Sequence, residues 1–226
     1  MLSIIIPTLN EEKTLPETLC NLFPQVSNEE IIVVDGGSTD NTQLICNKYP
    51  QIKFLHSAKG RATQMNNAAK IARGDTLLFL HADTLLPENA LTTIKNKIRQ
   101  SHIAAGGFKH SFGENDWRLR FISYLDNRRC FKTRIIYGDQ AMFIRSDLFR
   151  RLQGFPDVAI MEDIYFCEKL IDHTTPVILN AEVKTDPRKF IKMGIWRSLY
   201  RVIVIQVRNE IGLPVANDYP FFSEVR

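Results

Sequence analysis

Long apolar runs are missing from this chain of 226 residues. A membrane-spanning helix needs about 20 consecutive apolar residues, whereas the first apolar run stops at Pro7 and has no basic segment before it. That run suits a first β-strand better than a secretion signal, so we expect a cytoplasmic protein. Excess charge is small too: the formal net charge of +4 does not point to a nucleic-acid partner.

Cysteine is scarce as well. The four cysteines form no CxxC pair and have no histidine at zinc-finger spacing. They indicate free thiols in a reducing compartment rather than a disulfide framework or structural zinc. The chain also lacks repeats, low-complexity stretches and linker-like segments. At this length we expect a single domain over residues 1–226.

The first hundred residues alternate between strand-length apolar runs and helical patterns. This alternation predicts a mostly parallel α/β sheet with right-handed crossovers. Strands that are apolar throughout predict helices on both faces of that sheet. We expect strands at 2–6, 31–34, 52–55 and 76–80, and helices at 13–23, 39–48, 61–72 and 87–98.

The alternation stops near residue 105, and residues 106–187 predict a mixed-β half built onto the edge of the first. Its expected strands are 106–112 and 141–145, and its expected helices are 117–127 and 163–170.

Residues 188–226 predict an amphipathic helix followed by a tail. Its apolar stripe could pack on the rest of the chain or on a second copy, which would make a homodimer. Alternatively, the helix could lie in a membrane interface with its arginines at lipid phosphates, as a peripheral contact. The stripe contains Met193, Trp196, Leu199, Tyr200, Ile203, Val207 and Ile211, and Arg197, Arg201 and Arg208 line its flank.

Polar and acidic residues follow each of the first four expected strands. The carboxyl ends of parallel strands meet at one edge of the sheet, where ligands bind in open α/β folds, so we expect a nucleotide there. Taken singly, these residues have plainer interpretations, such as helix capping by Ser38 or Thr39 and a turn at Asp83. The four loops are 7–12, 35–40, 56–61 and 81–84.

In this order, the loops resemble those of the family 2 glycosyltransferases, inverting enzymes with the GT-A fold. The resemblance runs from residue 2 to about residue 170. It rests on Ser3–Glu11, Ile32–Asp40, Gly60–Arg61 with Asn66, Gly74–Asp75, Leu80–Thr84, Tyr137–Gln140, Gly154–Pro156 and Met161–Asp163. The Leu80–Thr84, Tyr137–Gln140 and Met161–Asp163 motifs resemble a small bacterial subgroup more narrowly.

The resemblance implies a hexosyltransferase that moves one sugar from a nucleotide sugar to an unknown small-molecule or lipid acceptor. Residues 1–105 would bind the donor and residues 106–187 the acceptor. The QxxRW pattern of processive synthases is absent, which favours a single transfer.

The implied donor-site residues begin with Thr8, Asn10 and Glu11 in the nucleoside pocket. Asp35 would accept a hydrogen bond from the base, and uracil N3–H suits a carboxylate, so a UDP-sugar is favoured. Lys59 and Arg61 would lie near the diphosphate.

The implied metal site departs from the family pattern, because His81-Ala82-Asp83 replaces Asp-x-Asp. One carboxylate together with diphosphate oxygens can hold Mn²⁺ or Mg²⁺, since both ions keep several waters. Coordination by His81 would favour Mn²⁺.

The acceptor hydroxyl must lose a proton as it attacks, which requires a base. Asp163, beside Glu162, is our candidate, although both acids could simply favour the start of a helix. Asp139 and Gln140 would border the acceptor pocket, or only form the turn into the next strand.

Two other functions remain open. A nucleotidyltransferase would carry a glycine-rich phosphate loop after the first strand, where this chain has Pro-Thr-Leu-Asn-Glu-Glu. A nucleotide-sugar-binding protein without transferase activity would be compatible with the altered metal motif.

Overall fold

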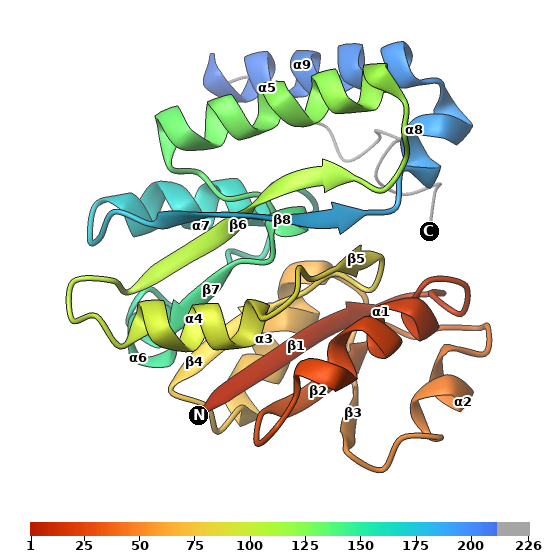
Figure 1. The fold of residues 1–226 in the computed structure, drawn as a ribbon, viewed down its shortest axis with the longest axis vertical. Coiled ribbons are helices and arrows are strands. Elements are labelled where there is room, and N and C mark those ends of the chain that lie inside the picture. Colours follow the sequence, from red (N-terminus) through yellow and green to blue (C-terminus); the bar gives the residue numbers. More distant parts are fainter. Residues whose placement is uncertain (212–226) are drawn as a thin grey trace.

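The computed structural model describes residues 1–211 and centres on one curled sheet (Figure 1). Its eight strands lie side by side in the order β3 (Ile52–His56), β2 (Glu30–Asp35), β1 (Leu2–Thr8), β4 (Thr76–Phe79), β7 (Phe143–Arg145), β6 (Ala105–Phe112), β8 (Val177–Thr185) and β5 (Thr84–Leu85).

The first four of these neighbours, β3-β2-β1-β4, are all parallel, so their carboxyl ends meet at one edge. Alternate residues of β1 enter different cores: Ile4 and Ile6 pack on one face of the sheet and Ile5 on the other. Helices α1 (Leu15–Leu22) and α4 (Ala90–Ile98) cover the first face, as expected for strands that are apolar throughout.

The opposite face is covered by α3 (Arg61–Ile71), α6 (Ser146–Arg151) and α7 (Glu162–Ile171). The inner face of α3 consists mainly of small residues, including the buried Ala68 and Ala69. Such residues let the helix axis lie close to the sheet. The first residue of α3 then lies at the carboxyl edge of the sheet.

The second half joins the same sheet through β7, which runs antiparallel to β4. Strands β6 and β8 are parallel to each other and carry most of this half. Above them in Figure 1, α5 (Trp117–Thr133) and α9 (Ile195–Glu210) lie side by side, with α8 (Arg188–Met193) at one end. The remaining short elements are α2 (Thr42–Cys46) and the 3₁₀ turns η1 (Phe23–Gln25) and η2 (Gly138–Gln140).

Several expected boundaries were wrong. The helix expected at 39–48 shrinks to α2, because the Asp40 carboxylate accepts from the Thr42 amide and hydroxyl and holds the preceding loop. The helix expected from Arg188 breaks at Gly194, whose φ of 86° is left-handed. Strands β8 and β5 and helix α6 were not expected at all, while α5 extends beyond residue 127 to Thr133.

Only part of the apolar stripe of the C-terminal segment packs on the rest of the described chain: Leu199 packs against Leu119 and Ile122 of α5. Trp196 and Tyr200 are exposed, whereas Ile195, Ser198 and Ile205 turn inward. Residues 212–226 of the expected tail lie outside the described residues. Within residues 1–211, no helix is long and apolar enough to cross a membrane.

Candidate functional site

The loops after β1 and β2 are tied together at the carboxyl edge. Asp35 is buried, and its Oδ2 accepts hydrogen bonds from the Gly37 and Ser38 amides at 3.0 and 2.8 Å. Its Oδ1 accepts from the hydroxyls of Ser38 and Thr8. Asn10, in the left-handed region with φ 57°, donates from its amide to Ser38 Oγ. Asp35 therefore shapes its own loop, whatever else it binds.

Gln64, on the first turns of α3, is a positioning residue that the sequence analysis missed. Its buried Nε2 donates to the carbonyls of both Thr8 and Val34 at 2.8 Å. A Cβ on Gly36 would lie 2.9 Å from Gln64 Cδ, so the loop after β2 needs glycine at that position. The helix, β1 and β2 are thereby locked in register at the edge.

We expect Gln64→Ala to lower the free energy of unfolding by about 2–4 kcal/mol. The substitution leaves two carbonyls without their buried donor and opens a small cavity. Asn67→Ala, on the same helix, is the matched control. Asn67 donates to Ser57 Oγ and accepts only a 3.5 Å contact from the exposed Lys70, so its loss should cost about 1 kcal/mol. Urea unfolding of both variants measures these losses, and equal losses of unfolding free energy in the two variants would contradict the prediction.

A partly buried charge cluster lies where β4 ends. Arg188 Nη2 contacts Glu11 Oε2 at 2.6 Å and Asp83 Oδ2 at 3.5 Å. Burial raises the pKa of Asp83, while the nearby Lys189 and Arg188 oppose that rise. The cluster thus joins a loop of the first half to the start of α8, a contact that the sequence pattern did not suggest.

His81 and Gly138 approach each other closely across the two halves. A Cβ built on Gly138 would lie 2.6 Å from His81 Nε2, so a side chain there would displace the His81 ring. The Gly138 amide instead donates to Asp163 Oδ2 at 2.7 Å. Gly138 therefore lies directly against His81 while its amide holds Asp163.

Asp163 is buried at the start of α7, and its Oδ1 accepts from the Ile164 amide. Burial, followed by the charge of Glu162, raises the pKa of Asp163 to about 6, against the opposing effect of Arg61. A carboxylate with such a pKa is ionised at neutral pH and is a stronger proton acceptor than an ordinary aspartate.

Glu162, the neighbour of Asp163, forms an ion pair with Arg61. It is buried, and its Oε1 pairs with Arg61 Nε at the start of α3. This ion pair connects α3 to α7 on the same face of the sheet. Its geometry gives Glu162 a positioning role beside Asp163 and holds the Arg61 guanidinium at the site.

Two adjoining pockets share this centre. The smaller one, about 50 Å³, is lined by the loop after β1, including Thr8 and Glu11, together with Gln64. The larger one, about 190 Å³, is lined by Asp163 and Tyr137 and by parts of α5, α8 and α9. Four residues line both pockets: Arg61, His81, Asp83 and Lys189.

The larger pocket has apolar walls and a polar cluster, of which only one member was expected from the sequence. Asp139 was expected there; Asp126 was not. Burial, followed by the charge of Asp139, raises the pKa of Asp126 to about 6. Behind them, buried His110 places its Nε2 3.6 Å from Asp139 Oδ2. Asp126 lies 11 residues before the Tyr137–Gln140 motif, on a helix that carries none of the motifs of the resemblance, so no sequence signal marked it.

Five of the expected site residues line neither pocket: Asn10, Asp35, Lys59, Gln140 and Glu162. Lys59 is exposed and lines neither of them. Gln140 is buried and uses its side-chain amide on backbone groups, accepting from the Tyr137 amide and donating to the Phe108 carbonyl. Its geometry gives it a structural role in the η2 turn.

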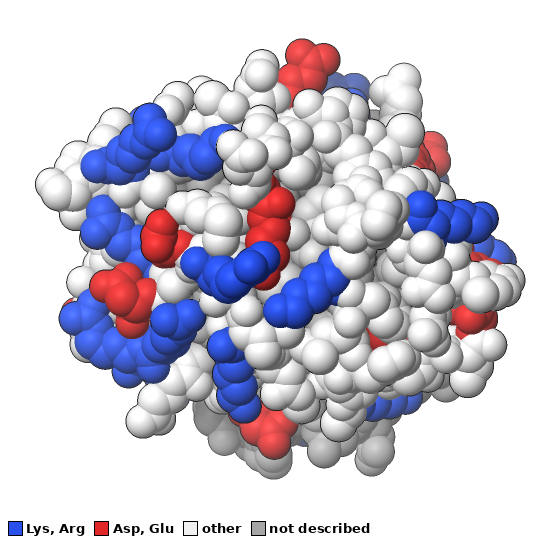
Figure 2. Space-filling view, turned by 90° about the horizontal axis from the view of Figure 1, so that it is seen from below, with Lys and Arg blue, Asp and Glu red and all other residues white. Residues whose placement is uncertain are grey.

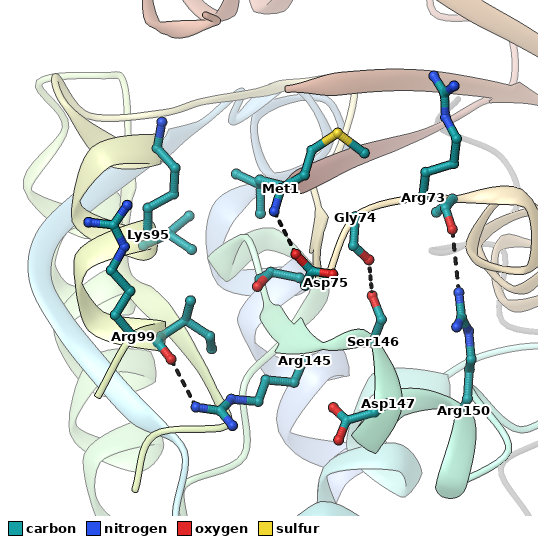
Figure 3. Close-up of a pocket in the computed structure, with 15 residues that line it drawn as sticks. Met1, Arg73, Gly74, Asp75, Lys95, Arg99, Arg145, Ser146, Asp147 and Arg150 are labelled. Carbon is teal, nitrogen blue, oxygen red and sulfur yellow. Dashed lines mark hydrogen bonds and ion pairs between the residues drawn. The ribbon is translucent and has the colours of Figure 1, made fainter. Parts of the chain in front are cut away.

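A hollow of about 700 Å³ lies at the opposite edge, near the amino ends of β1 and β4 (Figure 3). Arg145 and Arg150 donate there to backbone carbonyls, and Asp75 pairs with the Met1 amino group. The underside of the molecule carries many Lys and Arg side chains with carboxylates among them (Figure 2). None of the expected site residues lines this hollow, although Gly74 and Asp75, which carry part of the resemblance, do.

The donor groups near Asp83 fit a metal ion only together with a ligand. Within residues 1–211, no three His, Cys, Asp or Glu side chains are grouped closely enough to hold one by themselves. Asp83 and His81 nevertheless line both pockets, and Mg²⁺ and Mn²⁺ are commonly held by one or two carboxylates plus substrate phosphates. The chain therefore offers part of a coordination shell that a diphosphate would complete.

Similar proteins of known sequence are glycosyltransferases. The chain is 30% identical over 169 residues to the poly(ribitol-phosphate) beta-glucosyltransferase of Bacillus spizizenii, which covers 69% of this chain and 27% of that protein. It is 28% identical over 130 residues to the glycosyltransferase GlyG of Streptococcus pneumoniae, which covers 54% of this chain and 43% of that protein. The chain thus spans less than half the length of these relatives.

Solved structures show the same fold. The mannosyltransferase PcManGT from Pyrobaculum calidifontis, in complex with GDP-Man and Mn²⁺, matches with a TM-score of 0.70 and 22% identity, over 99% of this chain and 67% of that one. S. aureus TarS in complex with UDP-GlcNAc matches with a TM-score of 0.62 and 23% identity, over 80% and 58%. The expected GT-A fold is confirmed.

The model of the family described as "Glycosyl transferase family 2" matches residues 3–152. This match covers more than half of the chain and includes the loops after β1, β2, β3 and β4 that line the carboxyl edge. The chain therefore belongs to glycosyl transferase family 2.

Proposed function

We propose that this protein transfers a single hexose from a nucleotide sugar to an acceptor hydroxyl, with inversion at the anomeric carbon. The observation that carries the proposal is the sharing of four residues by the two pockets, with Asp163 on the far side of them. A donor in the smaller pocket and an acceptor in the larger one would meet at these residues. Membership in the family supports the same reaction.

The smaller pocket would receive the nucleotide. Thr8, Asn10 and Glu11 come from the loop after β1, and Asp35 holds the adjoining loop at the same edge. An Asp35 oxygen that also accepts from uracil N3–H would favour a UDP-sugar. Arg61 and Lys189, which line both pockets, would lie near the diphosphate; Lys59 would help only if its loop moves inward.

A divalent cation would bind at Asp83, with His81 as a second ligand, and would neutralise charge on the departing nucleoside diphosphate. Mn²⁺ and Mg²⁺ both suit this donor set. Arg188 is already in contact with Asp83 and Glu11, so it would add positive charge at the same place.

Asp163 would accept the proton of the acceptor hydroxyl as the oxygen attacks. The Gly138 and Ile164 amides hold its two oxygens in place, and the Glu162–Arg61 pair supports it from behind. In the larger pocket, Asp139 and Asp126 would accept hydrogen bonds from other hydroxyls of the acceptor. The acceptor is therefore a small molecule or lipid with a polyhydroxylated head, and the free cysteines suit action in the cytoplasm.

The donor can be identified by thermal shift with UDP-, GDP- and CDP-linked sugars, each with Mn²⁺, Mg²⁺ or EDTA. A ligand at a hundred times its Kd adds about 2.7 kcal/mol of stability, which raises the Tm of a protein of this size by about 5–10 °C. We expect UDP-sugars to raise the Tm by this amount in the presence of metal, and we expect no such rise in EDTA.

No shift with any nucleotide sugar would refute the proposed donor site. A shift without any sugar release, even to water, would instead identify a nucleotide-sugar-binding protein without transferase activity. Assay of free UDP in the same samples separates these outcomes.

A further inference from the structure

Two rows of exposed apolar side chains run along the outer surfaces of α5 and α9. Their spacing of three, four or seven residues places each row on one face of its helix. Every member is between 40% and 69% exposed. The α5 row contains Trp117, Phe121, Tyr124 and Phe131, and the α9 row contains Trp196, Tyr200, Ile203, Val207 and, at the helix end, Ile211.

The two rows form one surface, which we call the α5–α9 face. The rings of Trp117 and Trp196, at the starts of the two helices, are in edge contact, with centroids 5.9 Å apart. The helices then run side by side across the top of the molecule in Figure 1. Single exposed apolar residues are ordinary on a protein surface, but a contiguous patch of aromatic side chains marks an interaction site.

Basic residues are interspersed with the aromatic rows. Arg128 donates to the Tyr124 hydroxyl at 3.1 Å, and Arg118 pairs with the helix-capping Asp116. The basic residues of these helices and of the adjoining α8 that are exposed are Arg120, Arg128, Lys132, Lys192 and Arg197. Trp and Tyr rings prefer the head-group level of a bilayer, and arginines beside them reach lipid phosphates.

This charge pattern favours a membrane over a second copy of the chain. In a symmetric dimer the same patch meets itself, so the basic residues of one copy would face those of the other. Like charges across an interface are costly, whereas an anionic lipid surface neutralises them.

The inner sides of the same helices line the larger pocket. Val202 and Ile205 of α9, Phe190 of α8 and Asp126 of α5 all contribute to its wall. We propose that the α5–α9 face docks on an anionic membrane surface. Docking would hold the pocket beside the bilayer, within reach of an acceptor carried there; this consequence rests on the proposed function, whereas the docking does not.

Co-sedimentation of the full chain with sucrose-loaded vesicles tests the docking, with no donor or acceptor present. We expect the protein to bind vesicles of equal parts phosphatidylcholine and phosphatidylglycerol, and to bind pure phosphatidylcholine at least about tenfold more weakly. The binding should fall as salt is raised, because charges at a surface are screened.

Two paired variants test the face itself. Trp117→Ala/Trp196→Ala should weaken binding about tenfold or more, because both rings lose their burial in the lipid interface. Arg120→Glu/Arg197→Glu should weaken it about twentyfold or more. The matched controls lie on other surfaces: Leu44→Ala for the apolar change, and Arg99→Glu/Arg151→Glu for the same change in net charge. Both controls should bind as the wild type does.

Three results would overturn the proposal: no binding to anionic vesicles, equal losses in the controls, or a dimer in solution that dissociates in Trp117→Ala/Trp196→Ala. Light scattering after gel filtration measures whether the wild type and this variant are monomers or dimers. The thermal shift with UDP-sugars is measured on every variant, so a folded protein that binds donor but not vesicles refutes the docking and leaves the proposed function intact.

Discussion

Asp163→Asn is expected to lower the rate of sugar transfer by about 10²–10⁴-fold while donor binding is retained. The loss corresponds to removal of a general base, since an amide cannot accept the proton of the acceptor hydroxyl. Asp163 lines only the larger pocket, so the thermal shift with nucleotide sugar should stay close to that of the wild type. Release of the nucleoside diphosphate, measured with saturating donor, checks both statements.

The matched control is Asp172→Asn, at the exposed other end of α7, and it should transfer at the wild-type rate. Glu162→Gln should be intermediate, because it weakens the Arg61 pair that supports Asp163 without removing the base. A transfer rate within threefold of wild type in Asp163→Asn, by about the precision of such assays, would exclude Asp163 as the base.

The pH dependence follows from the raised pKa of Asp163. In the free enzyme, kcat/KM should fall as the pH drops below about 6, because the carboxyl becomes protonated. The effect on stability has the opposite sign: folded Asp163 binds its proton more tightly than in the unfolded chain. Its contribution is therefore present below about pH 4 and is lost as the pH rises through about 6.

Urea unfolding at pH 4.5 and pH 7 measures this contribution as a difference between proteins. The wild type should lose more stability over that interval than Asp163→Asn does, because only the wild type carries the titrating carboxyl. The raised pKa of Asp126 acts in both proteins and cancels in the comparison. An equal loss in the two would show that the Asp163 pKa is not raised.

Asp83→Ala is expected to remove the metal-dependent part of donor binding. The side chain is the only carboxylate among the four residues that line both pockets. Without it, a cation has only the diphosphate and His81 to bind. The extra stabilisation by Mn²⁺ or Mg²⁺ should therefore fall by most of the 5–10 °C expected with donor, and the transfer rate should fall by about 10²-fold or more.

Glu88→Ala, an exposed acid before α4, is the control and should keep the metal response. Because Arg188 pairs with Asp83, a fall in stability of the unliganded variant must be measured separately, by the Tm in EDTA. If the donor shift in Asp83→Ala stays sensitive to EDTA, the metal is held elsewhere in the site.

Local patterns were sufficient to predict the first half of the fold. The four parallel strands appear close to their expected positions, because continuous apolar runs between polar loops allow few other arrangements. The polar residues after these strands do gather at one edge, since parallel topology requires it. The short α2 and the break at Gly194 were not predicted. They depend on the hydrogen bond that Asp40 accepts from Thr42 and on the left-handed φ of Gly194, and helical periodicity shows neither feature.

Residue patterns alone were enough to identify the family, the parallel half of the sheet and the candidate acids Asp83 and Asp163. Tertiary structure alone decided which residues meet: Arg61 turns to Glu162, Arg188 bridges Glu11 and Asp83, and Asp126 joins Asp139. It also decided that the aromatic stripe of α9 faces outward beside that of α5. The reason is physical: periodicity specifies which face of a helix is apolar, whereas the partner of that face depends on contacts between segments far apart in the chain.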